Sequence, residues 1–166
     1  MNQLTVPRVR FRHAAAAVGV TKKTLRNWLV RGQVQIETES EGWNEFSLID
    51  LAELTLTAEL VRYGVGILPA SMAARSQISL STHLLASYKN TPAQAFMFAF
   101  RGARLFMQSP RAGLTHFKHA RDNEGAPADW AGASLLTIDI QTLIEEMLDR
   151  LAAAMGADDG ADEGDE

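Results

Sequence analysis

The chain of 166 residues has no cysteine, which excludes disulfide bonds, thiolate metal sites and cysteine nucleophiles. It also has no apolar run near the roughly 18 residues that a membrane span needs. Arg8, Arg10 and Arg12 are not followed by the long apolar segment of a signal peptide. A Gly-rich phosphate loop, a serine elbow and a paired-carboxylate site are all missing. We therefore expect a cytoplasmic protein that is not an enzyme and uses no cofactor.

Long stretches of the chain lack charge of one sign, although the net charge is only −4. Residues 1–36 hold seven Lys or Arg and no acidic residue, whereas residues 37–60 hold seven acidic residues and no base. Residues 61–121 have eight bases and no acid, and residues 122–166 have thirteen acids and a single base, Arg150. The whole-chain pI of about 5.6 therefore hides a first segment whose charge suits nucleic acid.

Residues 11–32 have the pattern of two short helices joined by a tight turn. The first helix is expected to end at Val18 and to bury one apolar face. Gly19 then supplies the turn, Thr21 caps the second helix through its hydroxyl, and Gly32 ends that helix. The residues expected to be buried are those at helical spacing: Phe11, Ala14, Ala15, Val18, Leu25, Trp28 and Leu29.

The outer side of the second helix is polar and basic, and such a helix after a tight turn fits the major groove of DNA. Arg26 and Asn27 are the predicted base readers, because their side chains can bind guanine and adenine through two hydrogen bonds each. Lys22 and Lys23 suit phosphate contacts, which add affinity and salt dependence. A solvated helix face is the alternative for all four. Arg12 and the two arginines before it either extend this contact as an arm or solubilise the N-terminus.

Further along, the pattern predicts a hairpin and two more helices. Residues 33–46 alternate loosely around a glycine-containing turn, and a hairpin after a helix-turn-helix is a wing. Ser47 and Asp50 form a predicted capping box that opens the third helix. A break at residues 64–66 separates it from a fourth helix, which is expected over about residues 69–89.

The C-terminal part mixes strand and helix patterns. Phe96, Phe98 and Phe100 alternate as in a strand, whose aromatic side forms a buried face or, as the less favoured alternative, lines a ligand pocket. A second strand is expected at residues 104–108. Residues 135–140 predict either a strand or the start of the last helix.

The last helix is expected over about residues 141–155. Its apolar residues recur at near-heptad spacing, which suits either a dimer seam or packing on the chain's own sheet. They are Ile140, Ile144, Met147, Leu151 and Ala154. Residues 156–166 hold six acids and are predicted to be disordered. This tail either confers solubility or competes with DNA for the basic helix.

Two histidines could suggest a metal site. His116 and His119 have the spacing of metal ligands on a helix, and Asp122 follows three residues later. Because no fourth ligand accompanies them, we expect ordinary surface histidines and no metal.

Together these patterns predict an α+β fold. An N-terminal winged helix-turn-helix domain is expected over residues 1–70, followed by a connecting helix over residues 71–90. A small mixed C-terminal domain for dimerisation or sensing, which includes the terminal amphipathic helix, is expected over residues 91–155. Residues 156–166 are expected to form the disordered acidic tail.

The order of motifs along residues 11–70 resembles the MerR-type winged helix-turn-helix of bacterial transcription regulators. Excisionase-like and phage DNA-binding proteins share much of this pattern. The residues that carry the resemblance are Ala15, Gly19, Val20, Thr21, Thr24, Leu25, Arg26, Trp28, Gly32, Gly42, Phe46, Ser47, Asp50, Leu51, Gly64 and Val65.

The resemblance implies which residues meet DNA. Thr21 and the four polar residues of the second helix would enter the major groove, and Trp43 and Asn44 of the wing would touch the adjacent backbone. The family often has an arginine where this chain has Asn44, which is followed by Glu45, and the wing also carries Glu37, Glu39 and Glu41. Because phosphate repels carboxylates, we expect the recognition helix, more than the wing, to hold the DNA.

The sequence thus predicts a bacterial, nucleoid-associated regulator that binds double-stranded DNA sequence-specifically. A homodimer on a two-fold site is expected, because two recognition helices one helical turn apart multiply affinity. Residues 67–89 lack the sustained heptads of the family's coiled coil, so dimerisation would use the C-terminal segment. The resemblance implies promoter control, with RNA polymerase as a further partner. The alternatives are an excisionase-like or architectural phage or plasmid protein, and a protein–protein adaptor on a degenerate winged helix.

Overall fold

The computed structural model describes residues 8–36, 45–86, 93–108, 116–121, 124–130 and 135–159. The predicted wing tip at residues 37–44 lies outside these ranges, as does the part of the predicted tail beyond residue 159. Residues 156–159, expected as the start of the disordered tail, are instead the last residues of a helix, so that expectation is wrong for them. In chain order the elements are β1 (Val9–Arg10), α1 (Phe11–Val18), α2 (Lys22–Val30), β2 (Glu45–Phe46), α3 (Leu48–Arg62), α4 (Ile67–Ala86), α5 (Ala93–Ala99), β3 (Ala103–Gln108), β4 (His116–Arg121), the 3-10 helix η1 (Ala128–Trp130), β5 (Leu135–Asp139) and α6 (Ile140–Asp159).

Local hydrogen bonds form the predicted turn between α1 and α2. Gly19 has a φ of 77°, which favours glycine, and its N–H donates to the carbonyls of Ala15 and Ala16. The hydroxyl oxygen of Thr21 accepts from the N–H of Thr24 at 3.0 Å and so caps α2. Both predicted helices and the cap between them are therefore confirmed.

The capping box at the start of α3 is also confirmed. The Ser47 hydroxyl accepts from the Asp50 N–H at 3.1 Å, and the Asp50 carboxylate accepts from the Ser47 N–H at 2.8 Å. From there α3 runs through the middle of the molecule and is buried along most of its length. It packs against α4, α1 and α6, so the core of the N-terminal half is built around it.

The strand β2 has a different partner from the one expected. Phe46 pairs with Val9 of β1 in an antiparallel register, and the segment at residues 33–36, expected as the first wing strand, has no regular structure. The reason lies in the core, where Phe46 is fully buried and its ring lies 6.1 Å from that of Phe11. Burial of Phe46 beside α1 brings β2 to the segment that precedes α1.

The expected strand at residues 96–100 is wrong, because this segment belongs to helix α5 and its end. Phe96 and Phe100 are four residues apart, so a helix brings their rings together, and the centroids lie 5.0 Å apart in an edge-to-face arrangement. Phe98 points away and is 68% exposed. The three rings therefore share neither a strand face nor a ligand pocket.

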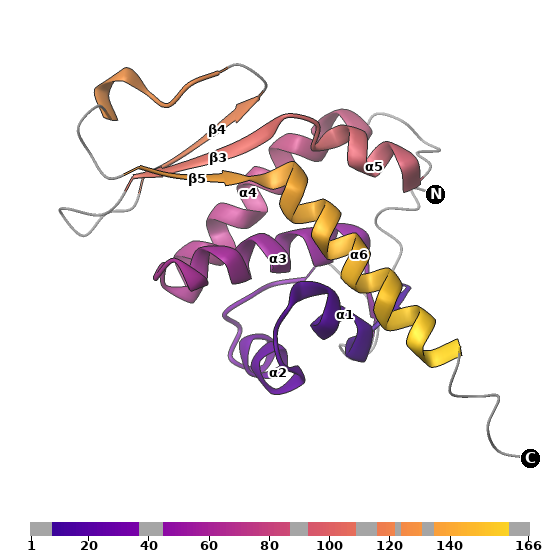
Figure 1. Ribbon diagram of the computed structural model, residues 1–166. Coiled ribbons are helices and arrows are strands. Elements are labelled where there is room, and N and C mark those ends of the chain that lie inside the picture. The colour runs from indigo at the N-terminus through magenta and orange to yellow at the C-terminus, as the bar shows by residue number, and fades with distance from the viewer. Residues whose placement is uncertain are drawn as a thin grey trace, which may run out of the picture.

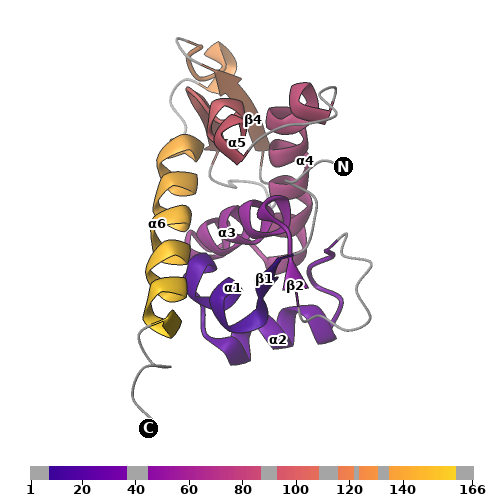
Figure 2. The ribbon, with the colours of Figure 1, turned by 90° about the vertical axis from the view of Figure 1, so that its right-hand side faces the viewer.

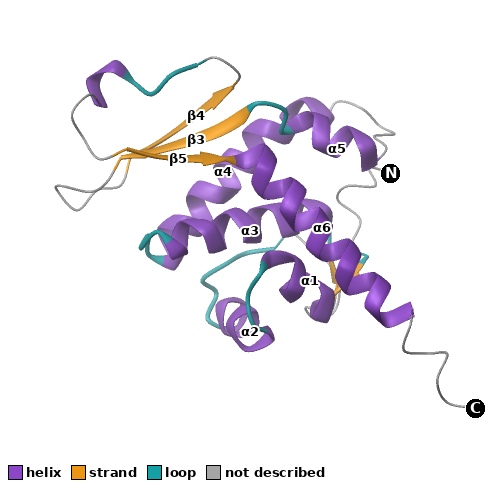
Figure 3. Cartoon of the chain, in the orientation of Figure 1, coloured by secondary structure: helices purple, strands orange, loops and turns teal. Residues whose placement is uncertain are grey.

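The strand predicted at residues 104–108 is confirmed as β3 of an antiparallel sheet with the order β4-β3-β5. Residues 135–140, expected as a strand or as the start of the last helix, form strand β5 as far as Asp139, and Ile140 begins α6. In the central strand, Leu105 lies opposite His119 of β4 and Ile138 of β5. Apart from the short β1–β2 pair, all described strands gather at one end of the molecule, and α1 and α2 lie at the other (Figure 3).

Helix α6 connects the two ends. It begins directly after β5 and runs past α3 to α1, as Figures 1 and 2 show from two directions. Its 20 residues give it a length of about 30 Å, which is about the diameter of a small domain. Of the predicted apolar stripe, Ile144, Met147 and Leu151 are buried within the chain itself. The stripe is therefore neither a dimer seam nor packed on the sheet alone, because the apolar faces of α1 and α3 cover it.

In the part of the chain that the structure describes, no helix has both the length and the apolar character required to cross a membrane.

Candidate nucleic-acid interface

Helix α2 presents the predicted residues on one exposed side. Leu25 and Leu29 are buried in the core and Trp28 is half-buried, so these three hold the helix against the protein. The opposite side is open to solvent at the end of the molecule farthest from the sheet (Figure 2). Its exposed residues include all the predicted groove residues of this helix and its cap: Thr21, Lys22, Lys23, Arg26 and Asn27.

Exposed bases extend beyond α2. Every lysine and arginine between residues 8 and 36 is exposed, and no acidic residue lies in that range. We call this set the basic surface, and its members are Arg8, Arg10, Arg12, Lys22, Lys23, Arg26 and Arg31. Seven like charges in one segment of the fold produce a field that attracts a polyanion.

The start of α2 is arranged to favour phosphate. The Thr21 hydroxyl accepts from the Thr24 N–H and lies 2.8 Å from the Thr24 hydroxyl, so its bonds serve the helix cap. The first N–H groups of α2 carry the positive end of the helix dipole, and Lys22 and Lys23 add full charges there. Thr21 thus acts through the helix that it caps, and the two lysines form the most positive part of the helix.

Arg26 has a partner that the sequence did not indicate. Its guanidinium carbon lies 5.6 Å from the centroid of the Phe11 ring, a cation–π distance. Phe11 is half-buried against Phe46, so the ring is held in place from its other side. The aromatic ring therefore restricts where the Arg26 side chain lies before any ligand arrives. The contact joins two helices, and no spacing rule within either helix predicts it.

The remaining predicted contact residues fall into two groups. Arg12 is exposed on α1, where its Nε donates to Nε2 of His13 at 3.1 Å. Arg12 therefore belongs to the basic surface, which is where an extension of the DNA contact beyond α2 would need it. Trp43 and Asn44 belong to residues 37–44 and lie outside the described part of the chain.

The two histidines with metal-like spacing lie on a strand and not on a helix. His116 and His119 are both in β4, where residues three apart point to opposite faces of the sheet. The His116 ring packs near Trp130, at 6.4 Å between centroids. Within the described ranges, no three potential ligands gather as a metal site would need.

His119 is nevertheless in an unusual environment. Its Nδ1 is buried without a hydrogen-bond partner among the described groups. Burial lowers the pKa of His119 from its ordinary value of 6.5, the charge of Arg121 lowers it further, and Glu124 acts in the opposite direction. Arg121 itself donates to the carbonyls of Ser81 and Ala99, at 3.2 and 3.0 Å, and so ties β4 to α4 and α5.

The lowered pKa of His119 predicts a pH dependence of stability. Below pH 6.5 the unfolded chain binds a proton at His119 that the folded chain binds less readily, so the free energy of unfolding should fall as the pH is lowered. His119→Gln should remove this part of the fall, whereas His116→Gln on the opposite face should not. Urea unfolding of wild type and both variants, at neutral pH and at about one pH unit below 6.5, measures the free energy of unfolding. Parallel losses in wild type and His119→Gln would assign the effect to other groups.

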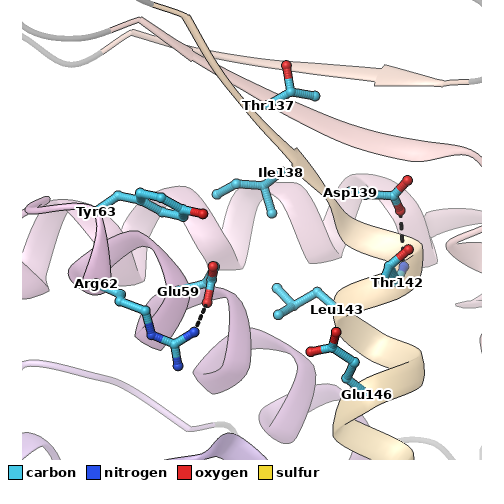
Figure 4. A pocket seen from close by; sticks show the side chains of 9 residues that line it. All are labelled: Glu59, Arg62, Tyr63, Thr137, Ile138, Asp139, Thr142, Leu143 and Glu146. Carbon is cyan, nitrogen blue, oxygen red and sulfur yellow. Dashed lines mark hydrogen bonds and ion pairs between the residues drawn. The ribbon is translucent and has the colours of Figure 1, made fainter.

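A cavity of about 350 Å³ lies where the end of α3 meets β5 and the start of α6 (Figure 4). Two of its carboxylates are held locally: Glu59 accepts from Arg62 at 2.7 Å, and Asp139 accepts from the Thr142 N–H at 3.0 Å. Glu146 lines the same cavity from α6. None of the residues predicted to contact DNA lies in it, so the cavity marks the junction between the N-terminal helices and the sheet.

Comparison with known families agrees with this geometry. Residues 9–74, which run from β1 into α4, match the model of the MerR HTH family regulatory proteins. No curated protein matches the chain. The N-terminal region is thus a MerR-type helix-turn-helix, as the resemblance predicted. Such a region indicates DNA binding and transcription regulation.

Proposed function

We propose that this protein binds double-stranded DNA sequence-specifically, as a homodimer, with α2 in the major groove, and thereby regulates transcription. The observation that carries the proposal is the exposed face of α2, where base-reading and phosphate-binding side chains stand together in a MerR-type region. Arg26 and Asn27 would read bases, and Lys22 and Lys23 would bind phosphate. A binding role of this kind needs no catalytic group.

Charge favours DNA over a protein partner. The basic surface has seven bases and no acid in residues 8–36, which is far from the mixed character of most protein–protein interfaces. We further propose that residues 1–70 carry the DNA contact and that residues 91–155 serve sensing, because the exposed apolar side chains that suit self-association lie on α4. The helix between them would connect these roles.

The proposed homodimer needs a surface other than the apolar stripe of α6, which is covered within the chain. Among the described elements, α4 exposes more large apolar side chains than any other, namely Leu68, Met72 and Leu80. Exposed apolar groups of this size are typical of contact surfaces. They support a contact between two copies through α4.

Selection of bound duplexes from a random pool, followed by mass measurement of the complex, tests the proposal. The expected result is one enriched sequence with two-fold symmetry, bound by two copies of the chain. Tight binding without any enriched sequence would instead support an architectural role. Absence of DNA binding at low salt would support the adaptor alternative and overturn the proposal.

Replacing Lys22 and Lys23 by alanine should weaken binding to all duplexes similarly. The loss should be electrostatic, because each phosphate contact releases about 0.9 counterion equivalents on binding. The slope of log affinity against log salt should therefore fall by about 0.9 for each lysine that contacts a phosphate. Titrations of the selected duplex and an unrelated duplex at several salt concentrations measure it. An unchanged slope would exclude both lysines from the contact.

A further inference from the structure

The last helix carries one basic side chain, Arg150, and it contacts the helix-turn-helix. Arg150 is the single base among residues 122–166. Its Nε donates to the carbonyl oxygen of Ala17 at 2.8 Å, across 133 positions of sequence. Ala17 lies in the last turn of α1, immediately before the turn that leads to α2.

The contact supplies a partner that α1 itself lacks. At the end of a helix the last carbonyls have no N–H of the same helix to accept from. Here the N–H groups of Gly19 and Val20 donate to Ala15 and Ala16, and Arg150 donates to Ala17. A cation at this position also interacts favourably with the negative end of the helix dipole.

The guanidinium lies directly against the turn. A Cβ placed on Gly19 would lie 3.8 Å from Nε of Arg150, so the side chain packs over this glycine. Glu146, one turn earlier on α6, lies 3.5 Å from Nη1 and helps to hold the guanidinium there. Met147 and Leu151, buried against the N-terminal helices, hold the backbone of α6 on either side of Arg150.

From these contacts we propose that Arg150 is a positioning residue for the recognition helix. By holding the last turn of α1 and packing over Gly19, it fixes the turn from which α2 begins and hence the direction of α2. The residue does not touch DNA itself. This inference rests on the proposed function, because it takes α2 as the helix that enters the DNA groove. It assigns a role to a residue outside the MerR-type region matched at residues 9–74.

Glu146 links the Arg150 contact to the cavity between α3, β5 and α6. Glu146 both lines the cavity of about 350 Å³ and pairs with Arg150. Figure 4 shows its carboxylate on α6 facing that cavity. The same stretch of α6 thus borders the junction with the sheet and holds the turn of the DNA-binding region.

Arg150→Met tests the proposal, because methionine keeps an apolar stem of similar shape and removes the donor and the charge. Affinity for the selected duplex should fall by about 2- to 30-fold, a usual range for residues that act through others. Affinity for an unrelated duplex should fall less and the salt slope should change little, because the long side chains of Lys22 and Lys23 can still reach phosphates from a shifted α2, whereas base contacts need one direction. Arg101→Met, an exposed arginine beyond α5, is the matched control.

Two results overturn the proposal. If Arg150→Met lowers affinity for both duplexes equally and reduces the salt slope by about 1, Arg150 contacts phosphate directly. If it changes neither affinity, the contact with Ala17 has no effect on α2. If Arg150→Met does not fold, Arg150→Lys replaces it in the same titrations. Lysine keeps the charge but offers a flexible point donor in place of the guanidinium. The proposal then requires a larger loss of affinity for the selected duplex than for the unrelated duplex.

A measurement without DNA separates this proposal from the proposed function. In Arg150→Met the backbone amides of Gly19, Val20 and Thr24 should exchange hydrogen faster than in wild type, because these amides donate within the turn and cap. Amides of β3 should exchange at the wild-type rate. Faster exchange in a protein that binds no DNA would leave the positioning of α2 supported and reject only the DNA function. Equal exchange at the three amides would reject the positioning role itself.

Discussion

Arg26→Ala is expected to reduce affinity for the selected duplex by about 5- to 150-fold, which corresponds to the roughly 1–3 kcal/mol of one bidentate base contact. The side chain is exposed on α2, and its guanidinium rests against Phe11, so it is already ordered at the surface that would meet the groove. Less side-chain entropy is then lost on binding, so the contact contributes a more favourable free energy of binding.

The measurement is a titration of both the selected duplex and variants changed at single base pairs. Wild type should lose affinity when the base pair that Arg26 reads is changed. Arg26→Ala should bind the changed and the unchanged duplex with equal affinity. Arg101→Ala removes the same charge from an exposed site beyond α5 and should behave as wild type. If Arg26→Ala keeps the wild-type preference at every base pair, Arg26 is not a base reader.

Ile144→Ala is expected to lower the free energy of unfolding by about 2–5 kcal/mol. Ile144 is fully buried in α6 and belongs to the core that α6 shares with the N-terminal helices. Truncation leaves a cavity inside that core, and close packing limits how far the neighbours can fill it. Since typical domains have only about 5–15 kcal/mol of stability, this loss is large.

Urea unfolding followed by both circular dichroism and tryptophan fluorescence measures this loss, with Trp28 of α2 as one of three fluorescent side chains. The two signals should shift together, because α6 shares its core with α1 and small domains usually unfold in one cooperative transition. Asp149→Ala, an exposed neighbour on α6, should stay within about 0.5 kcal/mol of wild type. A loss in Ile144→Ala as small as that of Asp149→Ala would show that α6 contributes little to this core.

The elements that were predicted correctly depend on short-range contacts. The Thr21 cap, the Ser47–Asp50 capping box and the Gly19 turn each join residues no more than about five apart. Such hydrogen bonds form wherever the residue types occur at the right spacing, so they can be recognised without the rest of the fold. The inner and outer faces of α2 were predictable for the same reason, since Leu25 and Leu29 repeat at helical spacing.

The elements that were mispredicted depend on distant partners. Phe96, Phe98 and Phe100 fit a strand period of two, but Phe96 and Phe100 also fit a helix, and five residues cannot distinguish the two. The apolar stripe of α6 indicated a buried face without indicating what would bury it. Phe46 likewise lies in a segment expected as a wing strand, but it pairs with Val9 of the segment that precedes α1.

The candidate site divides in the same way. Composition and spacing alone determined that residues 8–36 carry bases without acids and that Lys22, Lys23, Arg26 and Asn27 share the outer side of a helix, because charge and helical period belong to the chain itself. Only the tertiary structure decided that Phe11 lies under Arg26 and that Arg150 holds the end of α1. Those contacts join different elements, and their partners are chosen by packing of the whole core, which no local period records.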